Sequence, residues 1–171
     1  MTFKIALVGC GGMGRRHAHG YIELRKYFDS VTMSAVCDVH ADVAATVADE
    51  IGDATGDRPV IYTDFDEMLA DADLDGVAIG TSTPMHHRFA IKAMNAGLHV
   101  ITEKPMGLTL KACRQMREVS ESTGKVVAVA ENYRRDPMNR LTKALIDSGA
   151  IGTPYFALDI GVNSSGGAVM H

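Results

Sequence analysis

The sequence contains no long hydrophobic run, no excess of basic residues and no cationic leader. No stretch of roughly eighteen or more apolar residues, the length that a membrane span requires, occurs in the 171 residues, so we expect no membrane partner. The formal net charge is −4 and the basic residues form no stripe, so we expect no nucleic-acid partner. The chain begins directly with the strand-like FKIALVG, which argues against a signal peptide.

Cysteine is scarce as well, with three residues that form no C-x-x-C pair. Cys10, Cys37 and Cys113 are odd in number and far apart, as is usual for reduced thiols. Because free thiols persist in reducing compartments, we expect a cytoplasmic protein. The composition, 46% hydrophobic and 22% charged, is that of a globular protein able to bury a core.

The histidines do not form a metal-binding pattern. His17 and His19 are two residues apart, and His86 and His87 are adjacent. Neither spacing places both rings on one face of a helix, which requires a separation of about three or four residues. No carboxylate or cysteine completes a ligand set, so we expect no zinc site and no other bound metal.

What the sequence does contain is a regular alternation of short apolar runs with amphipathic segments. The alternation predicts βαβ units and hence an α/β fold with a doubly wound parallel sheet, the Rossmann architecture. We assign residues 1–130 to an NAD(P)-binding domain and 131–171 to the beginning of a second α/β domain, truncated here. Strands are predicted at 4–9, 31–38, 59–62, 75–80, 98–105 and 125–132, with a strand of a new sheet at 154–163, and helices at 12–28, 41–52, 64–71, 83–97, 109–124 and 136–152.

Glycine, proline and small polar residues mark the expected helix boundaries. Gly52 is predicted to stop the second helix, and Thr63 or Asp64 to cap the third. The helix over 83–97 has Pro84 near its first turn and Gly97 at its end, the asymmetry typical of helices.

The segment GCGGMG at residues 9–14 has G-x-G-x-x-G spacing, and it follows a predicted strand and opens a predicted helix. In that context Gly9 permits the tight turn, Gly11 lets the backbone approach a pyrophosphate, and Gly14 lets the helix pack closely on the strand. The amides and positive dipole at the helix start would then face the diphosphate. Candidate cofactor-binding residues in this loop are Gly9, Gly11, Gly12, Met13 and Gly14.

Two arginines follow the glycine loop. Cations in a first helical turn oppose the helix dipole, at a cost of a few tenths to about 1 kcal/mol each. A bound diphosphate would offset this cost, so Arg15 and Arg16 either lie near a diphosphate or are simply solvated.

Asp38 ends the second predicted strand, at the distance from the glycine loop that a ribose-binding acid requires. Its carboxylate can accept both hydroxyls of the adenosine ribose and would repel a 2′-phosphate. Because no arginine follows in DVHAD, NAD is favoured over NADP as the cofactor.

Ligands of such sheets bind at the carboxyl ends of the strands, so the residues after the fourth strand are further candidates. The segment GTSTPMHH offers three hydroxyls that either contact the cofactor or cap the following helix, and capping is expected of at least one of them. From this segment we take Thr81, Thr83 and His86 as candidate cofactor contacts.

After the fifth strand comes TEKPMG, in which Pro105 holds Lys104 in an extended conformation. Lys104 is the candidate catalytic residue, since a partly desolvated ammonium there can bind a substrate hydroxyl or carbonyl. Glu103 either orients the lysine, holds the nicotinamide ribose, or forms a solvated ion pair. Tyr133 and Arg134, after the sixth strand, either face the substrate or pack at the domain junction.

Taken in order, KIALVGCGGMGRRHA, VCD, GTSTPMHH, TEKPMG and ENYRR resemble the Gfo/Idh/MocA oxidoreductases over residues 3–162. The resemblance implies a Rossmann domain followed by an open-sheet α/β domain, and hydride transfer between NAD(P) and a sugar, inositol or related polyol. It makes Lys104 the residue that contacts substrate and nicotinamide, and Glu103 a cofactor contact. It also implies a homo-oligomer that assembles through the second domain.

One departure from the family pattern concerns the acid/base residue. Family members carry a D-x-x-x-H pair in the second domain, whereas here Asp159 is followed four residues later by Asn163, and His171 has no clear counterpart. The acid/base residue is therefore expected beyond this chain. An alternative hypothesis from a different class is a non-catalytic NAD(H)-binding regulatory module, against which the Lys104–Pro105 pair argues. Imino acids, biliverdin and dihydrodiols are alternative substrates that the Rossmann half does not separate.

Overall fold

The structure is a computed structural model that describes residues 2–158. The chain divides into two compact units, Met1–Glu131 and Asn132–His171, which are described separately. The predicted residues Asp159, Asn163 and His171 lie outside the described part.

The first unit is built on a six-stranded sheet in the order β3-β2-β1-β4-β5-β6, and every neighbouring pair is parallel. This order confirms the predicted doubly wound Rossmann fold. The strand order reverses between β1 and β4, so their carboxyl ends form the crevice where such folds bind ligands. The strands are β1 (Phe3–Val8), β2 (Val31–Cys37), β3 (Val60–Tyr62), β4 (Gly76–Ile79), β5 (His99–Thr102) and β6 (Val127–Val129).

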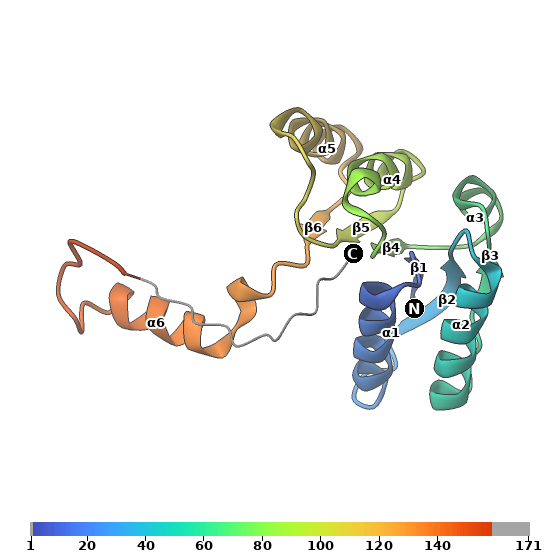
Figure 1. Cartoon of the computed structure of the whole chain (residues 1–171), viewed down its shortest axis with the longest axis horizontal. Helices are drawn as coiled ribbons and strands as arrows, with labels where there is room; N and C mark the ends of the chain where they lie inside the picture. The colour runs from blue at the N-terminus through green and yellow to red at the C-terminus, as the bar shows by residue number, and fades with distance from the viewer. Residues whose placement is uncertain (1, 159–171) are drawn as a thin grey trace, which may run out of the picture. The chain divides into compact units, whose positions relative to one another are not determined.

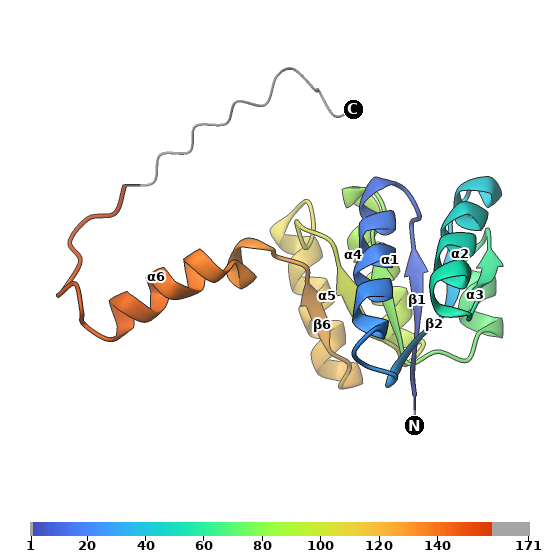
Figure 2. The same cartoon turned by 90° about the horizontal axis from the view of Figure 1, so that it is seen from below.

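Helices cover both faces of this sheet (Figure 1). One face carries α1 (Gly12–Arg25) and α2 (Ala41–Thr55), and the other carries α3 (Phe65–Asp71), α4 (Thr83–Asn95) and α5 (Leu110–Thr123). Figure 2 shows β1 leading directly into the turn before α1, which places the glycine loop at the carboxyl edge of the sheet.

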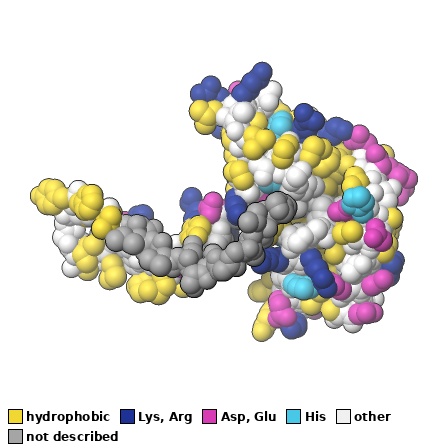
Figure 3. All heavy atoms as spheres, viewed as in Figure 1, with side chains coloured by type: hydrophobic (Ala, Val, Ile, Leu, Met, Phe, Trp, Pro, Cys, Tyr) yellow, Lys and Arg dark blue, Asp and Glu magenta, His cyan; other side chains and the backbone are white. Residues whose placement is uncertain are grey.

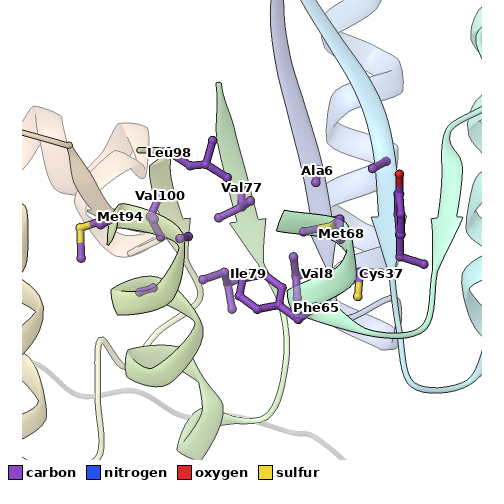
Figure 4. Close-up of a cluster of buried hydrophobic side chains, with 14 of the residues drawn as sticks. Ala6, Val8, Cys37, Phe65, Met68, Val77, Ile79, Met94, Leu98 and Val100 are labelled. Carbon is purple, nitrogen blue, oxygen red and sulfur yellow. The ribbon is translucent and has the colours of Figure 1, made fainter. Parts of the chain in front are cut away.

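Two clusters of buried apolar side chains hold the layers together. Cys37, Phe65, Ile79 and Met94 belong to the cluster under α3, α4 and α5 (Figure 4). The other cluster lies under α1 and α2 and includes Leu7. All four residues of β4 are buried, as expected for a parallel strand covered on both faces.

The predicted end of the second helix was wrong. Helix α2 runs through Gly52 to Thr55, and Gly56, with a left-handed φ of 81°, is its C-cap residue. Gly52 sits inside the helix where a Cβ would lie 3.0 Å from the Cβ of Arg58, so its small size is explained by packing rather than by a stop. Of the two candidate caps of α3, Asp64 is the one observed, accepting from the amides of Asp66 and Glu67.

The second unit contains a short 3₁₀ helix, Tyr133–Arg135, and α6 (Pro137–Asp147), which is capped by the Asp136 side chain. Apolar side chains of α6, including Met138 and Leu141, are exposed, and hydrophobic atoms are conspicuous along this segment in Figure 3. The strand predicted at 154–163 is not observed over 154–158, and the rest of it lies outside the described residues. No helix in residues 2–158 is both long and apolar enough to cross a membrane.

Candidate functional site

The glycine loop joins β1 to α1 in a conformation that only small residues permit. Gly9 has a φ of 86°, and an added Cβ would lie 2.8 Å from both Cγ2 and the backbone nitrogen of Thr81. A Cβ on Gly14 would overlap the carbonyl oxygen of Gly9. These two glycines therefore hold α1 against the end of β1, as their spacing predicts.

Gly11 has the opposite surroundings, since no atom lies within 4 Å of the position of its Cβ. It is the N-cap residue of α1, where no side chain caps the helix and no acidic residue occupies the first turn. The first-turn amides of α1 are thus available to an anion, and Gly11 leaves the approach to them open. By these criteria the loop fits a diphosphate.

A cavity of about 490 Å³ opens beside this loop at the carboxyl ends of β1, β2 and β4. Its volume is in the range of small-molecule sites. Of the predicted contacts, the cavity brings together Gly9, Gly11, Asp38 and Thr81. Further lining residues that the sequence did not single out for binding are Thr63, Phe65, Asp66, Met85, Phe89 and Lys92.

Asp38 is held at the mouth of the cavity by two backbone amides. Its Oδ2 accepts from the amide of Cys10 at 2.8 Å, and its Oδ1 accepts from the amide of His40 at 3.0 Å. Each oxygen can accept at least one further hydrogen bond, so the two amides orient the carboxylate and still leave it able to bind a ligand. This geometry suits an acceptor for a pair of neighbouring hydroxyls.

The cysteines beside the cavity are protonated thiols at neutral pH. Burial, and then the charge of Asp38, raise the pKa of Cys10 to about 12 and that of Cys37 to about 11. A thiol in this state is a poor nucleophile, so neither cysteine is suited to covalent catalysis. All three cysteines are free, as predicted.

Arg15 has a partner that the sequence analysis missed. Its guanidinium pairs with Glu50 of α2, with Nε donating to Oε2 at 3.0 Å. This ion pair between α1 and α2 accounts for an arginine in the first turn of α1 without a bound diphosphate. Arg16 is exposed, with Nη1 4.0 Å from the sulfur of Met13.

The hydroxyls after β4 do not cap α4, contrary to expectation. Ser82 occupies the N-cap position but makes no side-chain hydrogen bond there, and Thr81 Oγ1 lies 3.5 Å from the carbonyl of Ser82. Pro84, at the start of the helix, has no amide hydrogen to be capped. Thr81 and Ser82 instead line the cavity, while Thr83 is the first helical residue and does not.

His86 is buried in α4, and both of its ring nitrogens face backbone carbonyls rather than the cavity. Nε2 lies 3.0 Å from the oxygen of Thr81, and Nδ1 lies 2.9 Å from the oxygen of Pro105. The contact of His86 with a cofactor stays a prediction. The observed contacts favour a role in linking the backbone at Thr81 to the backbone at Pro105.

Glu103 is buried at the end of β5, and its carboxylate contacts His17 and the backbone of Lys104. Its Oε1 lies 3.0 Å from Nε2 of His17 in α1, and its Oε2 accepts from the backbone amide of Lys104 at 3.1 Å. The solvated Glu103–Lys104 ion pair considered above is therefore wrong. The lysine itself is exposed, and the peptide bond between Lys104 and Pro105 is cis.

His17 is the partner of Glu103, a contact that sequence reasoning missed. With Met13, Arg16 and Glu103 it lines a hollow of about 440 Å³ on the α1 face of the sheet, apart from the cavity at Asp38. Its partner is 86 positions away in the chain, so no local pattern signals the pairing. Among the described residues, no group of three or more histidine, cysteine or acidic side chains could hold a metal ion.

Two predicted residues belong to the second unit. Tyr133 and Arg134 lie in its 3₁₀ helix, and the ring of Tyr133 is exposed. Whether they face a substrate or a domain junction stays a prediction, as does the function assigned to 131–171.

The fold and the glycine loop define a dinucleotide-binding Rossmann unit. The sequence model described as "Oxidoreductase family, NAD-binding Rossmann fold" matches residues 3–131. The chain therefore belongs to the Gfo/Idh/MocA oxidoreductase family, as its motifs predicted.

Curated relatives give the same result. The chain is 33% identical over 154 residues to a D-apiose dehydrogenase of Paraburkholderia graminis, covering 90% of this chain and 39% of the relative. It is 32% identical over 155 residues to an inositol 2-dehydrogenase of Salmonella typhimurium, covering 90% of this chain and 44% of the relative. The chain thus spans less than half the length of the curated relatives it matches.

Among solved structures, scyllo-inositol dehydrogenase from Lactobacillus casei with bound NAD(H) and scyllo-inositol superposes with a TM-score of 0.78 at 29% identity. The match covers 89% of this chain and 43% of that one. A myo-inositol 2-dehydrogenase from Lactobacillus plantarum gives 0.76 at 29% identity, with the same shares covered. These relatives are named as dehydrogenases, and they lend no support to the alternative of a regulatory module.

Proposed function

We propose that this chain is the dinucleotide-binding part of an NAD-dependent oxidoreductase that acts on a sugar, inositol or related polyol. The observation that carries the proposal is the pairing of an open glycine loop with a fixed carboxylate on one cavity. Gly11 leaves room for a diphosphate at the start of α1, and the Asp38 carboxylate is placed to accept hydrogen bonds from the hydroxyls of a ribose. The names of the relatives supply the polyol class.

We propose NAD rather than NADP for an electrostatic reason. Asp38 presents a carboxylate whose two oxygens are already oriented by amides, and a 2′-phosphate at the same place would bring two anions together. The bound NAD(H) in the Lactobacillus casei enzyme supports this choice by analogy.

The chemistry assigned to the chain's own residues is binding and polarisation. NAD, when bound, supplies the nicotinamide that accepts a hydride from a substrate carbon. The exposed ammonium of Lys104 binds and polarises the substrate hydroxyl as its proton leaves. The proton acceptor is a residue outside this chain, as the family resemblance implies.

Glu103 has an indirect role in this proposal. Its carboxylate is held by His17 and accepts from the Lys104 amide, so it fixes the backbone from which the lysine side chain projects. A cytoplasmic location and assembly through the second domain are further proposals, and the three free cysteines fit a reducing compartment.

Turnover by the longer protein that carries this chain tests the proposed activity. That protein is incubated with NAD and a panel of inositols, aldoses and open-chain polyols, and the absorbance of reduced nicotinamide is followed. We expect reduction with at least one polyol and a much slower rate with NADP. No reduction of either dinucleotide across the panel, by folded protein that binds NADH, would refute the polyol assignment.

A further inference from the structure

We propose that His86 is a positioning residue that ties the cavity wall to the loop carrying Lys104. The inference rests on the proposed function, because it takes Thr81 and Lys104 to belong to one dinucleotide site. The inference adds a physical link between the loop at Thr81 and the loop at Pro105, which are 24 positions apart in the sequence.

The ring of His86 is 1% exposed and lies between the two loops. On one side, Nε2 is 3.0 Å from the carbonyl oxygen of Thr81, which lines the cavity after β4. On the other side, Nδ1 is 2.9 Å from the carbonyl oxygen of Pro105, which follows Lys104 directly. A single side chain therefore contacts the backbone of both loops.

The chemistry of these contacts requires the ring to donate. Carbonyl oxygens accept hydrogen bonds and never donate them, so each contact needs an N–H on the ring. A neutral ring donates to one carbonyl at a time, and a doubly protonated ring donates to both. Without the ring, the carbonyls of Thr81 and Pro105 both lose this contact, and within residues 2–158 no other hydrogen bond joins the Thr81 loop to Pro105.

Packing alone does not account for a histidine at this position. The other buried residues of α4 are Ala90, Ala93 and Met94, which fill space without directed polar contacts. The adjacent His87 provides a useful contrast, because its Nδ1 is buried with no hydrogen-bond partner among the described residues. His86 differs from His87 in that each of its ring nitrogens lies within hydrogen-bond distance of a backbone carbonyl oxygen.

Two conservative variants separate the two contacts. The side-chain amide of His86→Asn places a donor near the position of Nδ1, so this variant keeps the contact to Pro105 and loses the one to Thr81. The longer His86→Gln places a donor near the position of Nε2 and does the reverse. Amide hydrogen exchange of the 171-residue chain then reports on segments 80–85 and 103–108 separately.

We expect His86→Asn to speed exchange in 80–85 and His86→Gln to speed it in 103–108, each by about three- to tenfold, the change expected for one lost hydrogen bond. NADH affinity, followed by fluorescence titration, should fall by a similar factor in His86→Asn and stay within about twofold of wild type in His86→Gln. His87→Gln is the matched control and should leave both segments and the affinity unchanged.

Equal acceleration of both segments by the two variants, or no acceleration by either, would overturn the positioning role and leave His86 as a space-filling residue. If a variant fails to fold, the wild-type chain still tests the idea, because the His86 ring N–H proton should be protected from exchange in the proton NMR spectrum. Rapid exchange of that proton contradicts the proposal. If the two variants show the expected exchange pattern but the wild-type chain binds no NADH, the positioning role is supported and the proposed function is refuted.

Discussion

The two ends of the proposed site are built in different ways. At the Asp38 end, the carboxylate is fixed by two backbone amides, and the glycine loop packs closely against Gly80 and Thr81, which follow β4. At the Lys104 end, the ammonium is exposed, and the neighbouring carboxylate of Glu103 is directed to His17 instead. We therefore propose that the backbone of the first unit provides dinucleotide binding, and that the reaction also needs groups from outside this unit.

The largest expected effect tests the close packing of the glycine loop, at the Asp38 end of the site. In Gly14→Ala the new Cβ overlaps the carbonyl of Gly9, so α1 has to move away from β1. We expect the free energy of unfolding to fall by about 3 kcal/mol or more, measured by urea denaturation. Gly20→Ala, in the same helix with open space around its Cβ, is the control and should gain about 0.5–1 kcal/mol. Equal stability of the two variants would refute the close-packing role of Gly14.

A second variant separates binding from folding in the same loop. In Gly11→Leu the side chain enters open space beside the cavity, and the extended backbone there (φ −67°, ψ −162°) accepts any residue. We expect a stability loss of about 1 kcal/mol, typical of an N-cap position, and a fall in NADH affinity of about 100-fold. The NADH affinity of Gly11→Ala should lie between that of the wild-type chain and that of Gly11→Leu. An unchanged affinity in Gly11→Leu would place the diphosphate elsewhere.

The charge of Asp38 should matter by an intermediate amount. Asp38→Asn removes the negative charge and one acceptor, so we expect NADH affinity to fall by about tenfold and the preference over NADPH to narrow. Parallel fluorescence titrations with both dinucleotides measure the ratio. Asp42→Asn, at the exposed start of α2, is the control and should leave both affinities within about twofold. If Asp38→Asn still prefers NADH over NADPH as strongly as the wild-type chain does, Asp38 does not determine the cofactor specificity.

The smallest expected effect lies at the other end of the site. Lys104→Met removes an exposed ammonium without disturbing the Glu103–His17 contact, so NADH affinity of this chain should change by less than about twofold. In the longer protein the same change should remove turnover, because the substrate hydroxyl loses its polarising group. Retention of full turnover in Lys104→Met would show that the lysine has no catalytic role.

The sequence was sufficient for the features that depend on local spacing. The apolar runs and glycines predicted a parallel doubly wound sheet, which the observed strand order confirms. Gly9 and Gly14 occupy the close-packed positions that their spacing indicates, and Asp38 follows β2 as expected. These predictions succeed because a strand, a tight turn and a helix start each impose requirements within a few residues.

Most of the features that the sequence analysis missed are contacts between segments distant in the sequence. The pairings of Arg15 with Glu50 and of His17 with Glu103 join residues 35 and 86 positions apart, and no local pattern reports them. Gly52 resembles a helix stop in sequence, yet the close approach of Arg58 explains it better. The contacts of His86 likewise depend on how α4 packs against the loop after β5.

Titration calorimetry of the 171-residue chain with NADH is the most direct test of the account. We expect saturable binding with one NADH per chain, weaker binding of NADPH, and loss of the heat signal in Gly11→Leu, with circular dichroism confirming that both proteins are folded. Absence of any binding heat with either dinucleotide, on folded wild-type protein at several temperatures, would contradict the central claim that the loop at Gly9–Gly14 holds a diphosphate.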